Sequence, residues 1–253
     1  MQKVKMTLLI ENIKQGNFLS VDTASINKNF AVSDSEKLFL KNLKVMPADW
    51  YYRTNEVNYT VNSQGYRTHE FSTINWANSV VLFGCSTVFG PGVDDAHTID
   101  YFLSELLDAP VINLGVSSTS ITYALHNAVV LNQSYPTPRA VVNLWTEYSR
   151  IAYYLDDRVD NKGSWNEDDF IYEWLKHDSN PATYAVFAQM ISHQLWKNKT
   201  AYYEATFFPS TAELFKCEHL PVFDQARDLI HYGRQTNKAI AEKIANNITK
   251  ELN

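Results

Sequence analysis

The sequence predicts an α/β fold in which a parallel sheet lies between two layers of helices. Short apolar runs that end near a glycine or a polar residue occur at Val80–Phe83, Val111–Leu114 and Ala140–Leu144. Two segments with helical spacing of apolar residues, 99–107 and roughly 120–132, separate these runs. Regular alternation of strands and amphipathic helices is typical of a parallel sheet with right-handed crossovers.

The flanking segments are predicted from composition and spacing. Residues 1–75 are rich in Asn, Lys and Ser, and we interpret them as an irregular N-terminal extension with short strands that packs on the main domain, residues 76–253. The segment 150–198 is longer than a crossover between two strands requires and is rich in aromatic residues. We interpret it as a helical insertion that caps one end of the sheet. A fourth strand is expected at 201–208. Ile240, Ile244 and Ile248 indicate a final helix.

Composition excludes several classes of protein. The 253 residues carry a net charge of -6 without a basic cluster, which argues against a nucleic-acid partner. No apolar run approaches the roughly 20 residues that cross a bilayer, and Met6–Ile10 is too short for a signal-peptide core. The two cysteines offer no disulfide framework, and no spacing of a metal site or a P-loop occurs. We therefore expect a soluble, cytoplasmic protein, of a composition that suits a phage or a bacterium.

Two motifs carry the functional prediction. Gly84-Cys85-Ser86 follows the first buried strand, and Asp228-x-x-His231 precedes the final helix. A serine at the carboxyl end of a strand can act as a nucleophile when a histidine and a carboxylate activate it. Taken singly, the first motif is also compatible with a tight turn and the second with a helix cap. Cys85 is either a small buried residue or itself the nucleophile.

These motifs, in this order, resemble the conserved blocks of the SGNH (GDSL) hydrolase family. Gly84-Cys85-Ser86 is similar to the first block, Asn113-Leu114-Gly115 to the second and Asp228-x-x-His231 to the last, and the resemblance spans about residues 57–250. It implies a three-layer α/β/α sandwich with a flavodoxin-like strand order. It also implies a catalytic triad of Ser86, His231 and Asp228, with the backbone N–H groups of Ser86 and Gly115 in the oxyanion hole. No metal or organic cofactor is required.

The sequence departs from the family pattern at two positions. Cys85 stands where the family usually has Asp, and the third block lacks its Asn after the strand Val141–Leu144. Loss of one oxyanion donor typically lowers the rate by roughly 100- to 1000-fold. We expect the Thr146 hydroxyl to replace that donor, with Glu147 turned aside or paired with Arg150.

The predicted function is hydrolysis of a small acyl ester, for example an O-acetyl group on a carbohydrate. Ser86 would attack the carbonyl, with His231 within hydrogen-bond reach of its hydroxyl and Asp228 at the opposite ring nitrogen. The alternative is a non-catalytic protein that keeps the SGNH scaffold to bind a glycan or to serve a structural role, which Cys85 and the missing Asn favour. The acyl group and the oligomeric state are left open.

Overall fold

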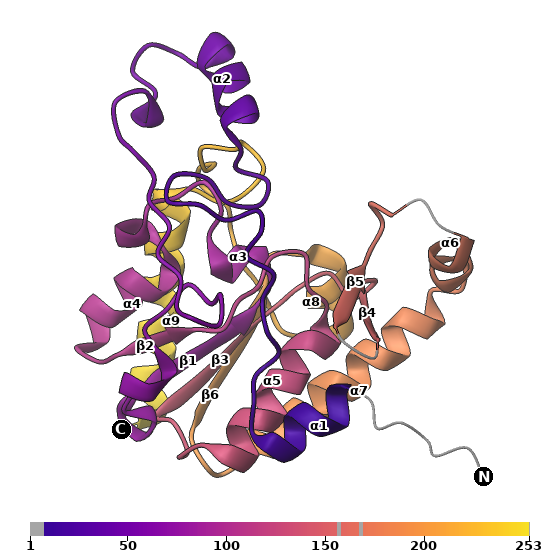
Figure 1. The fold of residues 1–253 in the computed structure, drawn as a ribbon. Helices are drawn as coiled ribbons and strands as arrows, with labels where there is room; N and C mark the ends of the chain where they lie inside the picture. Colours follow the sequence, from indigo (N-terminus) through magenta and orange to yellow (C-terminus); the bar gives the residue numbers. More distant parts are fainter. Residues whose placement is uncertain (1–7, 156–157, 167–168, 253) are drawn as a thin grey trace.

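A computed structural model of the protein describes residues 8–155, 158–166 and 169–252, and in it a five-stranded sheet occupies the centre (Figure 1). Its strands are β1 (Val80–Gly84), β2 (Val111–Asn113), β3 (Ala140–Trp145), β6 (Ala201–Thr206) and β7 (Glu218–His219). They lie in the order β2-β1-β3-β6-β7, and every pairing is parallel. This is the flavodoxin-like order, in which ligands bind beyond the carboxyl ends of the strands where the order reverses, between β1 and β3. The predicted sheet is confirmed.

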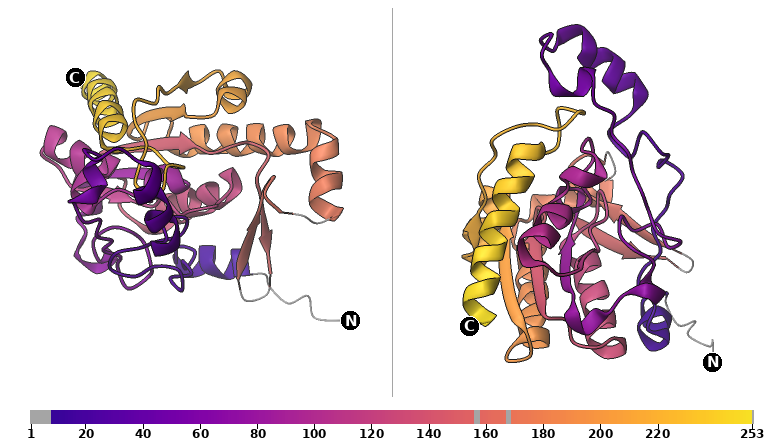
Figure 2. Two further views of the ribbon diagram at one scale, coloured as in Figure 1. Left: turned by 90° about the horizontal axis from the view of Figure 1, so that it is seen from above. Right: turned by 90° about the vertical axis from the view of Figure 1, so that its left-hand side faces the viewer.

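Helices cover both faces of the sheet (Figure 2). Val80 and Leu82 of β1 pack with α4 (Ile99–Leu107) and α9 (Arg234–Leu252) on one face. Val81 and Phe83 point to the other face, toward α5 (Ile121–Ser134). Successive side chains of a strand alternate between faces, and a parallel strand covered on both sides is therefore apolar throughout. The predicted three-layer α/β/α architecture is confirmed.

The two predicted crossover helices begin at side-chain caps. The Thr98 hydroxyl accepts a hydrogen bond from the backbone N–H of Tyr101 at the start of α4, and the Ser120 hydroxyl accepts one from Tyr123 at the start of α5. Such caps satisfy N–H groups that the first helical turn leaves without partners. The helices expected at 99–107 and at about 120–132 are observed within two residues of those bounds.

The N-terminal extension differs from the expectation of short strands. Its described residues form α1 (Leu8–Gln15), α2 (Glu36–Val45) and two short 3-10 helices, Tyr51–Arg53 and Phe71–Thr73, with only isolated β-bridges, and a third 3-10 helix, Trp76–Asn78, opens the main domain. A further 3-10 helix, Asp95–His97, precedes α4. The hydroxyl of Ser35 caps α2 through the N–H of Leu38, a local signal that the composition obscured. Residues 1–7 lie outside the described part of the chain.

The segment 150–198 contains the predicted helices, but they follow a hairpin that was not predicted. It begins with an antiparallel hairpin of β4 (Ile151–Tyr154) and β5 (Val159–Lys162), followed by α6 (Asp169–Lys176) and α7 (Ser179–Trp196). Because α7 packs against α5, it belongs to the helical layer on that face of the sheet, as part of the connection between β3 and β6. After β6, which ends two residues earlier than expected, α8 (Pro209–Phe215) leads to β7. None of the described helices is long and apolar enough to cross a membrane.

Candidate active site

Ser86 lies at the carboxyl edge of the sheet. Cys85 follows the last residue of β1, and Ser86 is the first residue of α3 (Ser86–Phe89). A Cβ at Gly84 would lie 2.8 Å from the Leu144 carbonyl oxygen and 2.4 Å from Val88 Cγ2, so glycine is needed where α3 turns over the end of the sheet. The buried strand thus delivers Ser86 to the edge at which open α/β sheets bind ligands.

Asp228 and His231 form a hydrogen-bonded pair in the loop before α9. Asp228 Oδ2 lies 2.7 Å from His231 Nδ1, as the motif predicted. Asp228 Oδ1 accepts the backbone N–H groups of Ile230 and His231, each at 3.0 Å. Between the two, Leu229 has a φ of 56°, a left-handed conformation that is uncommon for a bulky residue. This turn is what brings the carboxylate and the imidazole together.

The surroundings of Asp228 keep its carboxylate ionised. Burial by itself raises the pKa of Asp228, but the hydrogen bonds and charge of His231 and the N–H of Ile230 outweigh it and hold the pKa below its usual range. An ionised carboxylate beside Nδ1 favours the tautomer with the proton on that nitrogen. The other ring nitrogen of His231 is then left as a proton acceptor, which is what a general base requires.

The turn that follows Ser86 packs directly against this loop. Gly92 has a φ of 78°, and a Cβ there would lie 2.8 Å from Ala226 Cβ and 2.9 Å from the Arg227 nitrogen. The Arg227 N–H also donates to the Gly92 carbonyl at 2.9 Å. The end of the α3 segment and the loop that holds Asp228 and His231 are therefore neighbours.

The hydrogen bond expected between Ser86 and His231 is not formed. The Ser86 hydroxyl instead donates a long hydrogen bond of 3.9 Å to Cys85 Sγ. The Cys85 thiol is fully buried and also lies 3.6 Å from Thr87 Oγ1. In this conformation Asp228 and His231 are paired, while the serine hydroxyl points to its neighbouring thiol.

The three expected oxyanion donors differ in their availability. The Gly115 N–H is already used, since it donates to Asn113 Oδ1 at 3.0 Å. The Thr146 hydroxyl is buried and has no hydrogen-bond partner among the described residues. The Ser86 N–H, at the first position of α3, likewise donates to no described residue. Ser86 and Thr146 thus offer free donors, whereas Gly115 would have to release Asn113.

Arg150 lies beside this group, and sequence reasoning treated it only as a partner of Glu147. That pairing is confirmed, with Arg150 Nε 3.7 Å from Glu147 Oε2. Burial raises the pKa of the Cys85 thiol, but the charge of Arg150 and the hydroxyls of Thr146 and Thr87 lower it more, so the net shift is downward. The Thr146 hydroxyl contributes to the lower pKa of the Cys85 thiol, although it forms no hydrogen bond with a described residue.

Ser33 is a site residue that the sequence analysis missed. Its hydroxyl donates to Asp228 Oδ2 at 2.8 Å and lies 3.3 Å from His231 Nδ1. Nothing local marks Ser33, because its partners lie 195 and 198 residues further along the chain. The contact places a residue of the N-terminal extension on the Asp–His pair.

A buried ion pair holds Ser33 in this position. Its neighbour Asp34 accepts hydrogen bonds from Arg227 Nε at 3.0 Å and Nη2 at 2.7 Å, and from the Tyr59 hydroxyl. Both members of the ion pair are almost wholly buried. Asn42 of α2 donates to the Arg227 carbonyl at 3.0 Å. Charge-assisted, bidentate contacts of this kind fix geometry strongly, so segment 31–34 is fastened to the loop 226–231.

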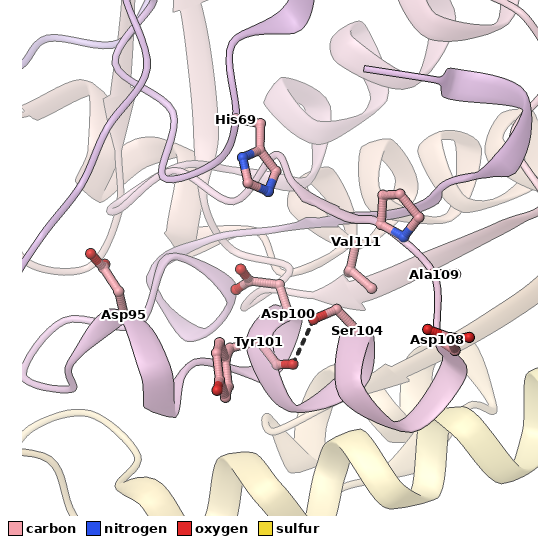
Figure 3. A pocket seen from close by; sticks show the side chains of 9 residues that line it. His69, Asp95, Asp100, Tyr101, Ser104, Asp108, Ala109 and Val111 are labelled. Atoms are coloured by element: carbon pink, nitrogen blue, oxygen red, sulfur yellow. Dashed lines mark hydrogen bonds between the residues drawn. The ribbon is translucent and has the colours of Figure 1, made fainter. Parts of the chain in front are cut away.

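A separate acidic pocket of about 420 Å³ lies elsewhere (Figure 3). Asp95, Asp100 and Asp108 line it together with His69, beside α4 and the start of β2. Burial raises the pKa of Asp100. The pocket borders Val111, which pairs with the first residue of β1, so it lies at the opposite end of the strands from Ser86. Within the described ranges, no group of three His, Cys, Asp or Glu residues is arranged to hold a metal ion.

Comparison with known proteins finds similarity at the level of structure. No family model and no curated protein matches the chain. A protein of the G-D-S-L family from Desulfitobacterium hafniense is 12% identical, with 67% of this chain and 98% of that chain covered and a TM-score of 0.44. A family two carbohydrate esterase from Clostridium thermocellum, solved with cellohexaose, is 10% identical, with 69% and 64% covered and a TM-score of 0.46. The psychrotrophic esterase EstA from Pseudoalteromonas sp. is 14% identical, with 69% and 98% covered and a TM-score of 0.42. The protein is thus similar to solved SGNH and GDSL hydrolases, and this similarity concerns the fold alone.

Proposed function

We propose that the protein is a serine ester hydrolase that removes a small acyl group, such as acetyl, from an alcohol such as a carbohydrate hydroxyl. The observation that carries the proposal is the 2.7 Å pair of Asp228 and His231, in a loop packed against the turn that follows Ser86. A buried carboxylate on Nδ1, with the other ring nitrogen left as an acceptor, is the arrangement that activates a serine.

In the proposed reaction the Ser86 hydroxyl oxygen bonds to the ester carbonyl carbon while His231 takes the hydroxyl proton. The tetrahedral intermediate collapses, the alcohol leaves with the proton from His231, and an acyl-serine ester remains. Water then attacks that ester by the same steps and releases the acid. The Ser86 N–H and the Thr146 hydroxyl would stabilise the oxyanion. Ser86 must first rotate away from Cys85, whose thiol it contacts in this structure.

The second candidate function is a non-catalytic scaffold that binds a glycan or serves a structural role. Two observations favour it: the Ser86 hydroxyl contacts Cys85 in place of His231, and the Gly115 N–H is already used by Asn113. Both are hydrogen bonds that a bound ester could exchange. A measurement of hydrolysis therefore separates the two candidates.

The test measures hydrolysis of 4-nitrophenyl acetate and covalent labelling by a fluorophosphonate. We expect the wild type to do both, Ser86→Ala to do neither, and Cys85→Ala to keep most of the activity, since a buried thiol there only fills space. Wild-type protein that neither hydrolyses nor labels above the Ser86→Ala background would favour the scaffold. An active Ser86→Ala together with an inactive Cys85→Ala would make Cys85 the nucleophile.

A further inference from the structure

An apolar pocket of about 240 Å³ opens on the α5 side of the sheet's carboxyl edge. Ile121 from the start of α5, Tyr148 and Arg150 from the segment after β3, and Trp174 and Tyr184 from α6 and α7 contribute to its walls. The hairpin and α6 lie beside the end of α7 in Figure 1. The pocket is smaller than the roughly 300–1,000 Å³ of sites that enclose a whole drug-sized ligand, so it suits one substituent of a substrate.

Among the described residues that line this pocket, Arg150 is the one cation, and its guanidinium forms no hydrogen bond with a described residue. Its side chain is 12% exposed and stacks over Trp165 and Phe208, with centroid distances of 4.9 and 5.5 Å. Glu147 lies 3.7 Å away, too far for a hydrogen bond. No described residue accepts from the guanidinium, and its Nε is fully buried. A guanidinium carries five donors in a planar fork that matches a carboxylate.

The pocket lies at the same edge of the sheet as the candidate nucleophile. Gly84 and Leu144 are paired across β1 and β3, so the segments that leave these strands start at the same level of the sheet. Ser86 follows Gly84 by two positions, and Arg150 lies in the segment after β3. The guanidinium is close enough to lower the pKa of Cys85 against the effect of burial. Arg150 therefore lines the pocket, and its charge reaches Cys85, the neighbour of Ser86.

We propose that Arg150 binds a carboxylate on the ester substrate while the apolar pocket holds the carbon skeleton that carries it. The proposal rests on the proposed hydrolase function and narrows its substrates to esters with an anionic substituent. A carboxylate would accept the free guanidinium donors in a bidentate pair, which is the strong form of this interaction. It could belong to the acyl group or to the alcohol, and matched substrates distinguish these two sources.

The experiment compares kcat/KM for two pairs of esters. The acyl arm pairs 4-nitrophenyl hemiglutarate with 4-nitrophenyl pentanoate, and the alcohol arm pairs 3-acetoxybenzoate with 3-acetoxybenzamide. We expect Arg150→Met to lower the ratio of kcat/KM for the charged ester to kcat/KM for the neutral ester about 10- to 100-fold in one arm. Arg150→Lys should give an intermediate ratio. Lys176→Met, which removes an exposed cation on α6, is the control and should leave the ratio unchanged.

Two further variants test the proposal even if Arg150→Met does not fold. Tyr184 lines the pocket but is 58% exposed, so Tyr184→Glu and Tyr184→Gln should both fold. Tyr184→Glu should lower the preference for the charged ester, whereas Tyr184→Gln should leave it unchanged. Equal losses on charged and neutral esters in Arg150→Met would overturn the proposal, because they would assign Arg150 to the oxyanion or to folding. A wild type without a preference for the charged ester in either arm would overturn it as well.

Binding to the Ser86→Ala protein separates this inference from the proposed function. By calorimetry, 3-hydroxybenzoate should bind more tightly than 3-hydroxybenzamide, and Arg150→Met should abolish the difference. If the wild type hydrolyses no ester but this preference is found, the hydrolase proposal fails and the carboxylate site stands. If esters are hydrolysed but 3-hydroxybenzoate and glutarate bind no better than neutral analogues, the carboxylate site fails and the hydrolase stands.

Discussion

Ser33 shows how a single hydroxyl from a distant segment can shape the candidate triad. Asp228 Oδ2 accepts from both His231 Nδ1 and the Ser33 hydroxyl, so two donors fix the direction of one carboxylate oxygen. Val32 has a φ of 57°, a strained conformation for a β-branched residue, which the ion pair at Asp34 helps to hold. We therefore regard Ser33 as a positioning residue for Asp228 and His231.

Removal of that hydroxyl should lower turnover more than substrate binding. Ser33→Ala deletes a hydrogen bond to a charged group, of a kind that contributes about 1.5–3 kcal/mol, and we expect kcat to fall roughly tenfold or more with KM little changed. Ser33→Thr keeps the hydroxyl and should restore much of kcat. Steady-state kinetics on 4-nitrophenyl acetate measures both. Equal kcat values for Ser33→Ala and the wild type would show that the backbone N–H groups alone orient Asp228.

Among single residues, those with a local sequence motif could be predicted from the sequence, and those without a motif could not. Asp228 and His231 are separated by three positions, so their pairing follows from one turn of the chain. Ser33 and Arg150 lie in stretches without a motif. Their roles depend on tertiary contacts that no spacing encodes. Gly115 illustrates a different limit of sequence analysis. The resemblance suggested that its N–H is free, but in the structure this N–H donates to Asn113 Oδ1.

Among the elements, the turn between α3 and α4 joins the two halves of the candidate site. Gly90 and Gly92 both have positive φ, at 77° and 78°, so the turn requires residues that tolerate the left-handed region. They differ in their surroundings. A Cβ at Gly92 would meet the backbone of Arg227 at 2.9 Å, whereas one at Gly90 would meet only side-chain atoms, at 3.2 Å or more.

This difference makes the two glycines a matched pair. Both Gly→Ala variants should lose stability because of the positive φ, but Gly92→Ala should lose about 1–3 kcal/mol more, since it also forces the loop 226–228 to move. Its activity should fall further than that of Gly90→Ala, because Asp228 lies in the displaced loop. Urea denaturation and esterase assays of both variants measure these effects. Indistinguishable activities would indicate that the loop adapts without moving the Asp–His pair.

The elements that the sequence predicted well are those with a strong apolar period. Buried parallel strands and amphipathic helices are specified by local pattern, and β1, β2, β3 and α4 were found with nearly the expected bounds. The hairpin β4–β5 has half-buried residues throughout and no clear alternation. β7 has two residues, too few for any period. These elements exist because neighbouring segments pair with or cover them.

Across the whole molecule, the N-terminal extension belongs to the core as well as to the candidate site. Phe18, Leu19 and Tyr66 are buried in the same apolar cluster as Val81 of the central strand, and Asn127 of α5 binds both the Leu19 N–H and the Tyr66 hydroxyl. Removal of the extension would expose this face of the sheet. We infer that the extension and the sheet unfold together, so that global stability reports on both.

The pH dependence of global stability should reflect His126, a buried histidine on α5. Both of its ring nitrogens lack hydrogen-bond partners in the described part of the chain, and its ring stacks on Tyr154 with centroids 6.0 Å apart. Burial lowers the pKa of His126 to about 4, against about 6.5 in an unfolded chain. Between these values the unfolded state binds a proton that the folded state does not. The free energy of unfolding should then fall by up to about 1.4 kcal/mol per pH unit as the pH drops through this window.

His126→Phe keeps a ring against Tyr154 and removes the titration. Above about pH 6.5 the histidine is neutral in both states, so there the variant should differ from the wild type only through packing. Toward pH 4 the variant should gain stability relative to the wild type, because it no longer has a proton to bind on unfolding. Urea unfolding at several pH values measures this, with the exposed His177→Phe as the control for loss of a histidine. Parallel pH dependences for wild type and His126→Phe would mean that His126 is already protonated, or hydrated, in the folded protein.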